Sequence, residues 1–453
     1  MSSNAEIKDL RWASLQFTDL AGFFRQVIVR VKPGGKSLEE LVSKLDGSSV
    51  KGFTGVEESD LLLKPDIKTF ARLPWSNTIG RLICRVYLDS ERFVRDPRYV
   101  AEKLDDLLTS TNIKPFVSAE LEFFVFDKVS VKVSPQKQFF EISSTEASWE
   151  DLPFINRVKE GYYVTYPKDK FIDFKTELAE TLINYFGLAV EALHHEVAAA
   201  SQHEISFEGG SLTHVSDSIQ TVKYVTRTLA SLKGYVANFM PKPVYGDNGN
   251  GMHVHVSLWE GGENIFYDPN GEYACLSQEA RYFISGLIEH GRALSAIVSP
   301  TTNSYKRLVP GYEAPTYLAW GAGNRSVAIR IPAYEKCSKS VRVEYRPPDP
   351  SANPYLATTA IVLAGLDGIK KKLDPGDPVK ENMYEELTTR RNSIISLPKN
   401  LDEALDELES DSNWLSPVFP KELLETYIEI KRRESRLLQS YPSPAEFYHY
   451  LDL

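Results

Sequence analysis

The strongest constraint on the fold is an apolar run, VSAELEFFVFD (residues 117–127), that contains two carboxylates, Glu120 and Glu122. Its β-branched and aromatic residues predict a strand, and positions i and i+2 of a strand share a face. Two like charges on one buried face repel each other and lose their hydration. The pattern therefore predicts a positively charged group between these two side chains.

The bulk composition is that of an ordinary globular protein. The chain has 453 residues, which is enough for a large core and for more than one domain. A net charge of −10 argues against nucleic acid or a membrane surface as the main partner. The three cysteines, Cys84, Cys275 and Cys337, are far apart and form no CxxC pair, which fits a reducing compartment and excludes a thiolate metal site. With no signal core and no apolar run of about 18 residues, we expect a cytoplasmic protein.

The first hundred residues predict a small α+β unit. The expected elements are a hairpin at 12–31 that turns at Asp19–Gly22, a helix at 36–45, a strand at 81–89 and a helix at 95–111. Ser37 and Glu40 have the spacing of a capping box, and Asp96-Pro97 is a typical helix start. We place the domain boundary in the last of these helices, giving domains 1–104 and 105–453.

The larger part of the chain mixes polar strands with long helices. Helices are predicted at 173–187, at 276–298 as one continuous helix, at 353–366 in the core and at 420–441, with an irregular tail at 442–453. Without strict βαβ alternation, this order favours an α+β fold. The Gly-Lys-Ser at 35–37 is no P-loop, because the required first glycine is replaced by Arg30.

Four later segments repeat the polar strand faces. They carry Glu196 and Glu204 flanked by His194, His195 and His203; His253, His255 and Ser257; Arg342, Glu344 and Arg346; and Arg325 with Arg330. Each segment alone also fits a half-solvated sheet face or a structural ion pair. Together they favour chemistry, because carboxylates in excess over imidazole indicate Mg²⁺ or Mn²⁺ rather than zinc. Arginines beside such carboxylates indicate a phosphoryl group.

Two loops add to this interpretation. The glycine-rich segment YGDNGNGMH (residues 245–253) would let the backbone approach a ligand closely, although a simple turn has the same composition. The segment SYKRLVPGYEAP (residues 304–315) carries Glu313 at its tip, a pattern typical of a mobile lid. An exposed acid on a loop is, however, usually only solvated.

Seven segments, in the same order and over nearly the whole length, resemble glutamine synthetases of the bacterial and archaeal type (type I). They begin LDGSSVKGFTG, AELEFFVFD, HHEVAAASQHE, FMPKPVYGDNGNG, PTTNSYKRLVPG, GNRSVAIRIP and RVEYRPPDPSANP. The resemblance implies an α+β fold with a small N-terminal β-grasp domain and a large catalytic domain, built on a curved antiparallel sheet with surrounding helices. It also implies a dodecamer of two stacked hexameric rings with active sites between subunits.

The resemblance assigns roles position by position. Glu122, Glu196 and Glu204 match the ligands of one metal, and Glu120, His253 and Glu344 those of a second. The nucleotide side matches Glu191, His255, Ser257, Arg330 and Arg342. The glutamate side matches Asn248, Gly249, Arg307, Glu313 and Arg346, and the arginines around the transferred phosphoryl match Arg325, Arg330 and Arg342. The ammonium site matches Asp46 and Ser49 of a neighbouring subunit, together with the flap acid Glu313.

The implied activity is ATP-dependent ligation of ammonia to L-glutamate through γ-glutamyl phosphate, with Mg²⁺ or Mn²⁺ as cofactor and a role in glutamine biosynthesis and nitrogen assimilation. Asp46 and Glu313, with Arg325 and Arg330, would be the catalytic groups. The alternative is a related ligase that uses a polyamine or ethanolamine. The intact Asp46-Gly47-Ser48-Ser49 favours ammonium, because a bulky amine has no use for a compact anionic pocket. A metal hydrolase would need more His and Asp than the chain supplies, and an inactive homologue should have lost metal ligands.

Overall fold

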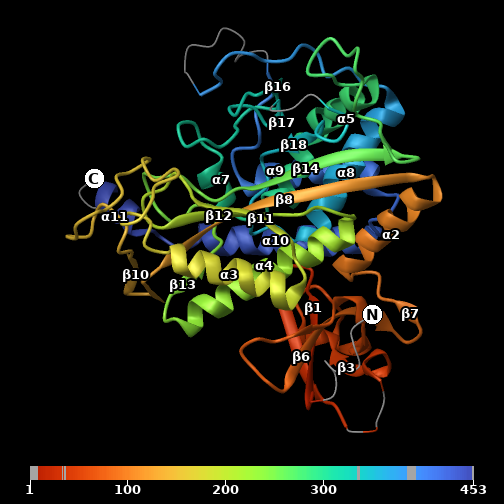
Figure 1. Cartoon of the computed structure of the whole chain (residues 1–453), viewed down its shortest axis with the longest axis vertical. Helices are drawn as coiled ribbons and strands as arrows, with labels where there is room; N and C mark the ends of the chain where they lie inside the picture. Colours follow the sequence, from red (N-terminus) through yellow and green to blue (C-terminus); the bar gives the residue numbers. More distant parts are fainter. Residues whose placement is uncertain (1–8, 33, 35–36, 334–336, 385–393, 451–453) are drawn as a thin grey trace.

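The computed structural model of the chain describes residues 9–32, 34, 37–333, 337–384 and 394–450. Figure 1 shows two units: an N-terminal one around β1, β3 and β6, drawn in red and orange, and a larger one crossed by the long strands β8 and β14. Both units combine strands with helices, as the sequence predicts for an α+β fold.

The N-terminal unit is a mixed sheet. Its strands are β1 (Trp12–Thr18), β2 (Phe24–Arg30), β3 (Ser43–Asp46), β4 (Asp60–Pro65), β5 (Ala71–Arg72), β6 (Ile79–Leu88) and β7 (Glu91–Arg92). The order is β2-β1-β6-β4-β3, with β5 and β7 also paired to β6. Strands β1 and β6 are parallel and the other pairs antiparallel. Short 3₁₀ helices cover Leu38–Glu40, Gly47–Ser49, Val56–Glu58 and Ile67–Thr69.

The predicted hairpin at 12–31 is confirmed. The carboxylate of Asp19 accepts a hydrogen bond from the Phe23 amide at 2.9 Å, and Gly22 adopts a φ of 94° that only glycine tolerates well. A Cβ at Gly22 would lie 3.3 Å from the Cα of Asn353 in the larger unit. The turn therefore needs glycine both for its backbone angle and for the close approach of the two units.

The predicted helix at 36–45 is wrong. The capping box of Ser37 and Glu40 forms, but it opens only a single 3₁₀ turn, and the chain then enters β3, where Ser43 lies opposite Leu63. A short helix begins with an unfavourable nucleus. Pairing with β4 satisfies the backbone and packs Leu45 against the small core instead.

The larger unit is built on a nine-stranded sheet. Its strands are β8 (Ile113–Phe126), β11 (Val190–His195), β12 (Gln202–Phe207), β13 (Val236–Asn238), β14 (Met252–Glu260), β15 (Glu263–Asn264), β16 (Trp320–Ala322), β17 (Ile329–Ile331) and β18 (Val343–Tyr345). The order is β11-β12-β8-β14-β18-β17-β16, with β13 beside β8 and β15 beside β14. Only β16 and β17 are parallel. Strands β9 (Lys128–Ser134) and β10 (Lys137–Ser143) form a separate hairpin.

The helices cover one side of this sheet and its ends. They are α2 (Pro97–Ser110), α3 (Ile172–Phe186), α4 (Leu212–Leu232), α5 (Gln278–Glu289), α6 (Gly291–Val298), α7 (Ser304–Arg307), α8 (Pro354–Lys371), α9 (Leu401–Ser410), α10 (Lys421–Gln439) and α11 (Pro444–Tyr450). Helices α2 and α4 pack on β8 and against α8, and the buried Val254 and Val256 of β14 join the same core. Within the described ranges, no helix combines the length and apolar character needed to cross a bilayer.

Several helix predictions are confirmed at their ends. Asp96 caps α2 by accepting from the Arg98 amide, and α3 ends at Gly187 with a φ of 65°. The predicted single helix at 276–298 is instead two helices, α5 and α6, which meet at His290. The tail predicted to be irregular contains α11. The predicted boundary between residues 104 and 105 falls inside α2, whose Leu104 belongs to the larger core.

Candidate active site

The pairing of six strands, β11, β12, β8, β14, β18 and β17, brings the predicted polar faces together. In the register of the large sheet, Glu204 lies opposite Glu122 and next to His194, while His253 lies opposite Glu120. On the other side of β14, Glu344 lies between His255 and Arg330. Because the side-chain period of a strand is two, these polar groups share the face that points away from the apolar core.

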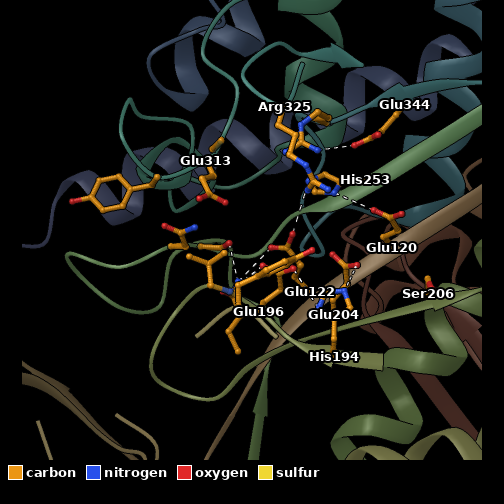
Figure 2. Close-up of a pocket in the computed structure, with 18 of the residues that line it drawn as sticks. Glu120, Glu122, His194, Glu196, Glu204, Ser206, His253, Glu313, Arg325 and Glu344 are labelled. Atoms are coloured by element: carbon orange, nitrogen blue, oxygen red, sulfur yellow. Dashed lines mark hydrogen bonds and ion pairs between the residues drawn. The ribbon is translucent and has the colours of Figure 1, made fainter. Parts of the chain in front are cut away.

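These side chains line a cavity of about 550 Å³, shown in Figure 2. All six predicted metal ligands line it, as do the other predicted residues with the exceptions given below. The lining also includes groups to which the sequence assigned no role: Lys159, Tyr162, Tyr163, Gln202, Ser206 and Tyr312. Most of these lie in loops, where no periodic pattern marks a side chain as facing the site.

One group of donor atoms consists of Glu120, Glu204 and His253, whose ligand atoms lie within 4.8 Å of one another. The carboxylate of Glu120 lies 3.4 Å from His253 Nδ1 and 3.2 Å from His255 Nε2. Burial opposes the charge of Glu120, but these two imidazoles outweigh burial and lower its pKa. Glu120 is therefore an ionised oxygen donor.

A second group consists of His194, Glu196 and Glu204, again within 4.8 Å. His194 Nε2 lies 3.0 Å from Glu204 and its Nδ1 lies 3.5 Å from Glu196. From the sequence, His194 is predicted only as a neighbour of Glu196 and Glu204, with no role of its own. The signal that could have revealed it is its position two residues before Glu196, at the end of β11.

The predicted ligands Glu122 and Glu344 are in the cavity but outside both groups. Glu122 accepts hydrogen bonds from the Gly251 amide at 2.7 Å and from Gln202 Nε2 at 3.3 Å. Glu344 is paired with Arg330 and, at 2.6 Å, with Arg346. Burial opposes the charge of Glu344, but Arg346, the imidazoles of His255 and His253, and Arg330 together outweigh burial and lower its pKa to about 2.

The acids at the centre of the cavity repel one another. Burial, and then the charges of Glu122 and Glu204, raise the pKa of Glu196 well above its usual value. Burial, and then the charges of Glu120, Glu122 and Glu344, do the same for Glu204. A carboxylate-rich set of this kind fits a hard divalent cation, which relieves both repulsion and desolvation. The residues present therefore fit Mg²⁺ or Mn²⁺.

Five arginines are also part of the cavity wall. Arg307, Arg325, Arg330, Arg342 and Arg346 all line it. Arg307 is anchored by its contacts with the carbonyls of Arg346 and Pro347 at 3.1 and 2.8 Å, and Arg342 Nε donates to His255 at 3.3 Å. Arginines held in this way present fixed positive charge to an anionic group such as phosphate.

The glycine-rich loop and the flap also reach the cavity. A Cβ at Gly249 would lie 2.1 Å from the carbonyl oxygen of Pro241, so only glycine fits there. Asn248 and Gly249 line the cavity, and Glu313 reaches it from the loop that follows α7. Figure 2 shows Glu313 across the cavity from the carboxylates of β8 and β12.

Four predicted site residues, Asp46, Ser49, Glu191 and Ser257, do not line this cavity. Glu191 is exposed at an irregularity of β11, and Ser257 is buried beside Trp259, whose Nε1 donates to it at 2.9 Å. Asp46 and Ser49 are exposed in the N-terminal unit. Hydrogen bonds from Ser48 and Ser49 lower the pKa of Asp46, so it is ionised.

The fold and the cavity define a class of protein: an α+β enzyme in which one cavity holds both grouped carboxylates suited to divalent cations and arginines suited to a phosphoryl group. Family models identify which member of this class it is. Residues 9–89 match the model "Glutamine synthetase, beta-Grasp domain" and residues 94–450 match "Glutamine synthetase, catalytic domain". The chain belongs to the glutamine synthetase family.

Individual glutamine synthetases are similar to the chain over nearly its whole length. A glutamine synthetase of Sulfolobus acidocaldarius is 51% identical over 98% of this chain and 96% of its own, and one of Thermotoga maritima is 40% identical over 99% and 98%. Among solved structures, a Plasmodium falciparum glutamine synthetase has a TM-score of 0.89 at 29% identity, covering 99% of both chains. A solved complex of GmaS with ADP has a TM-score of 0.85 at 28% identity, covering 100% of this chain and 99% of its own.

Proposed function

We propose that the protein is a glutamine synthetase, which ligates ammonia to the γ-carboxylate of L-glutamate while ATP becomes ADP and phosphate. The observation that carries the proposal is the meeting of two carboxylate–imidazole donor groups with five arginines in one cavity. Membership in the family, with full-length relatives named glutamine synthetase, gives this cavity its reaction.

The reaction needs activation because a carboxylate is a poor acyl donor. Transfer of the terminal phosphoryl of ATP to the γ-carboxylate produces γ-glutamyl phosphate, from which phosphate departs readily. Arg325, Arg330 and Arg342 would stabilise the charge that builds up on the transferred group. Their place in the lining of the cavity that also holds the carboxylates supports this role.

The predicted ligands would hold two divalent cations: Glu122, Glu196 and Glu204 the first, and Glu120, His253 and Glu344 the second. His194 is a further candidate donor to the first. Bound Mg²⁺ or Mn²⁺ supplies Lewis-acid polarisation of the phosphate and charge neutralisation around the substrate carboxylate.

The remaining predicted residues would position the substrates. Asn248, Gly249, Arg307 and Arg346 would hold the amino-acid end of glutamate, and His255 with Glu191 and Ser257 would contact the nucleotide. One structural relative, GmaS, was solved as a complex with ADP, which supports a nucleotide in this cavity. Glu313 would exclude water from the acyl phosphate. It would also accept a further proton, after Asp46 has taken the first one from ammonium.

We infer that the ammonium site is completed by a second copy of the chain. Asp46 and Ser49 are exposed and lie outside their own cavity, which supports their donation to a neighbour. Asp46, ionised, would take a proton from ammonium. The family resemblance favours a dodecamer of two stacked hexameric rings. It also favours two domains in each chain, at residues 1–104 and 105–453. The three cysteines, which lie far apart in the sequence and form no CxxC pair, support a cytoplasmic location.

An amine panel tests the proposed function. The purified full-length chain, with ATP, glutamate and Mg²⁺ or Mn²⁺, is given ammonium, methylamine, ethanolamine or putrescine, and both phosphate and the γ-glutamyl product are measured. We expect the highest kcat/KM with ammonium, because a compact anionic pocket favours the smallest cation. A clear preference for any larger amine would instead support the alternative γ-glutamyl-amine ligase.

A further inference from the structure

The ring of Tyr312, next to the flap acid Glu313, contacts two lysines. Lys242 Nζ is 3.6 Å and Lys159 Nζ is 4.5 Å from the centre of the ring. Ammonium groups at these distances are attracted to the ring face. Both lysines come from segments far from the flap in the sequence, so the contacts tie the flap to the rest of the molecule.

Each lysine also has a second contact. Lys159 Nζ donates to the carbonyl oxygen of Gly311 at 2.7 Å, so it holds both the ring and the backbone of the flap. Lys242 Nζ donates to the carbonyl oxygen of Asp247 in the glycine-rich loop. Burial and the nearby charge of Lys159 lower the pKa of Lys242 to about 8, so this ammonium group remains mostly charged at neutral pH.

The side chain of Asp247 links three segments at the edge of the cavity, including that of Lys159. It is buried, and it accepts hydrogen bonds from the amides of Lys159 at 3.2 Å, Asn248 at 3.0 Å and Ala199 at 2.7 Å. These amides belong to three separate segments that all border the cavity. One carboxylate thus connects the loop of Lys159, the glycine-rich loop and the turn that follows Glu196.

The flap itself has a strained backbone. Glu313 has a φ of 56°, a conformation unfavourable for a residue with a side chain. Such angles persist where surrounding contacts hold them in place. Tyr312 precedes Glu313, so the contacts of its ring with Lys159 and Lys242 can hold the backbone of Glu313 in this conformation.

We propose that Tyr312, through its contacts with Lys159 and Lys242, is a latch that holds the flap over the cavity. This inference rests on the proposed function. The three are positioning residues that act through Glu313. With the latch open, water reaches γ-glutamyl phosphate. The water oxygen then bonds to the acyl carbon, the bond from this carbon to the phosphate oxygen breaks, and glutamate and phosphate leave. ATP is consumed without formation of glutamine.

The test is the amount of phosphate released per glutamine formed when ammonium is limiting. In Tyr312→Leu, which removes the aromatic face, we expect this ratio to rise about tenfold, the scale of a lost pair of cation–π contacts. Tyr312→Phe keeps the ring face and should stay within about twofold of wild type. The matched control is Tyr245→Leu, because Tyr245 is 97% exposed in the neighbouring loop; it should also remain coupled.

Lys242→Met provides an independent variant, with thermal unfolding measured to show that it is folded. It should uncouple the reaction in the same direction, since only one lysine would remain on the ring. If the wild type couples phosphate to glutamine and both Tyr312→Leu and Lys242→Met couple as tightly, the latch is refuted while the proposed function stands. If the wild type forms no glutamine at all, the proposed function fails and the latch fails with it.

Discussion

Two regions of the molecule bury many charges, but they do so in opposite ways. Between the N-terminal unit and the helices, Arg98 binds Asp217 through two hydrogen bonds of 3.0 and 2.9 Å and also contacts Asp66 at 2.9 Å. In the cavity, Glu196 and Glu204 face other acids. Burial opposes the charge of Asp66, but Arg98 and Arg85 outweigh it and lower its pKa, whereas the pKa of Glu204 is raised.

The difference shows that the effect of a buried charge on stability depends on the groups beside it. An acid whose partners are arginines is already neutralised and contributes to the assembly of the two units. An acid whose neighbours are other acids lowers the stability of the folded protein until a cation binds. The surplus of like charge is therefore the physical mark that distinguishes the site from the structural network, and three variants test this distinction.

The largest expected effect is that of Glu204→Gln. Glu204 belongs to both donor groups, so the variant should lose activity by about 10³-fold or more in kcat/KM, corresponding to about 4 kcal/mol. Without metal, however, the same variant should unfold at a higher temperature than wild type, because it removes one of the repelling charges.

Calorimetry with and without Mg²⁺ or Mn²⁺ checks this prediction. Excess cation should raise the unfolding temperature of wild type, because a ligand that binds only the folded state stabilises it, and should raise that of Glu204→Gln much less. Equal metal stabilisation in the two proteins would contradict the assignment of Glu204 as a ligand.

The second effect concerns the structural network, where Asp217→Asn should behave in the opposite manner. Removal of the charge leaves Arg98 buried without its main charged partner, and the amide NH2 that replaces Oδ2 can no longer accept the 2.9 Å hydrogen bond from Arg98. We expect a loss of about 3 kcal/mol in the free energy of unfolding, with kcat/KM per folded molecule unchanged within about twofold.

The matched control is Glu429→Gln, which breaks the exposed pair of Arg433 and Glu429 on α10. It should change stability by less than about 0.5 kcal/mol. Denaturant unfolding of both variants gives the two changes in the free energy of unfolding. A loss of stability in Asp217→Asn that depends on added metal would contradict the proposed distinction between the two regions.

The smallest effect is a pH dependence at a third charged cluster, where His290 contacts Asp411 at 2.6 Å and Asp367 at 2.8 Å. Burial opposes its charge, but the hydrogen bonds to both carboxylates outweigh burial and raise its pKa. A raised histidine pKa stabilises the fold fully below the pKa of the unfolded chain, about 6.5. That contribution is lost as the pH rises through the folded value.

Thermal unfolding of wild type and His290→Gln across this pH range tests the sign. The variant should be less stable by about 1 to 2 kcal/mol at pH 6, and the difference should shrink as the solution becomes more alkaline. A difference that grows with pH would show that His290 is neutral in the folded protein.

Much of the site could be predicted from single segments. The two-residue period placed Glu120 with Glu122 and His253 with His255, and these pairs do share the cavity face. The contacts of His290 at the break between α5 and α6 could not be predicted, because its partners Asp367 and Asp411 lie 77 and 121 residues away. The helix predicted at 36–45 failed for a similar reason: its capping box is local, while the pairing with β4 that replaces it is not.

The sequence by itself determined which side chains share a strand face, where α2 begins and where α3 ends, because these follow from backbone geometry within a few residues. Only the tertiary structure decided that Glu204 lies opposite Glu122 and that Lys159 reaches Tyr312. Strand register and loop contacts depend on the packing of segments distant in the chain, and no single segment contains that information.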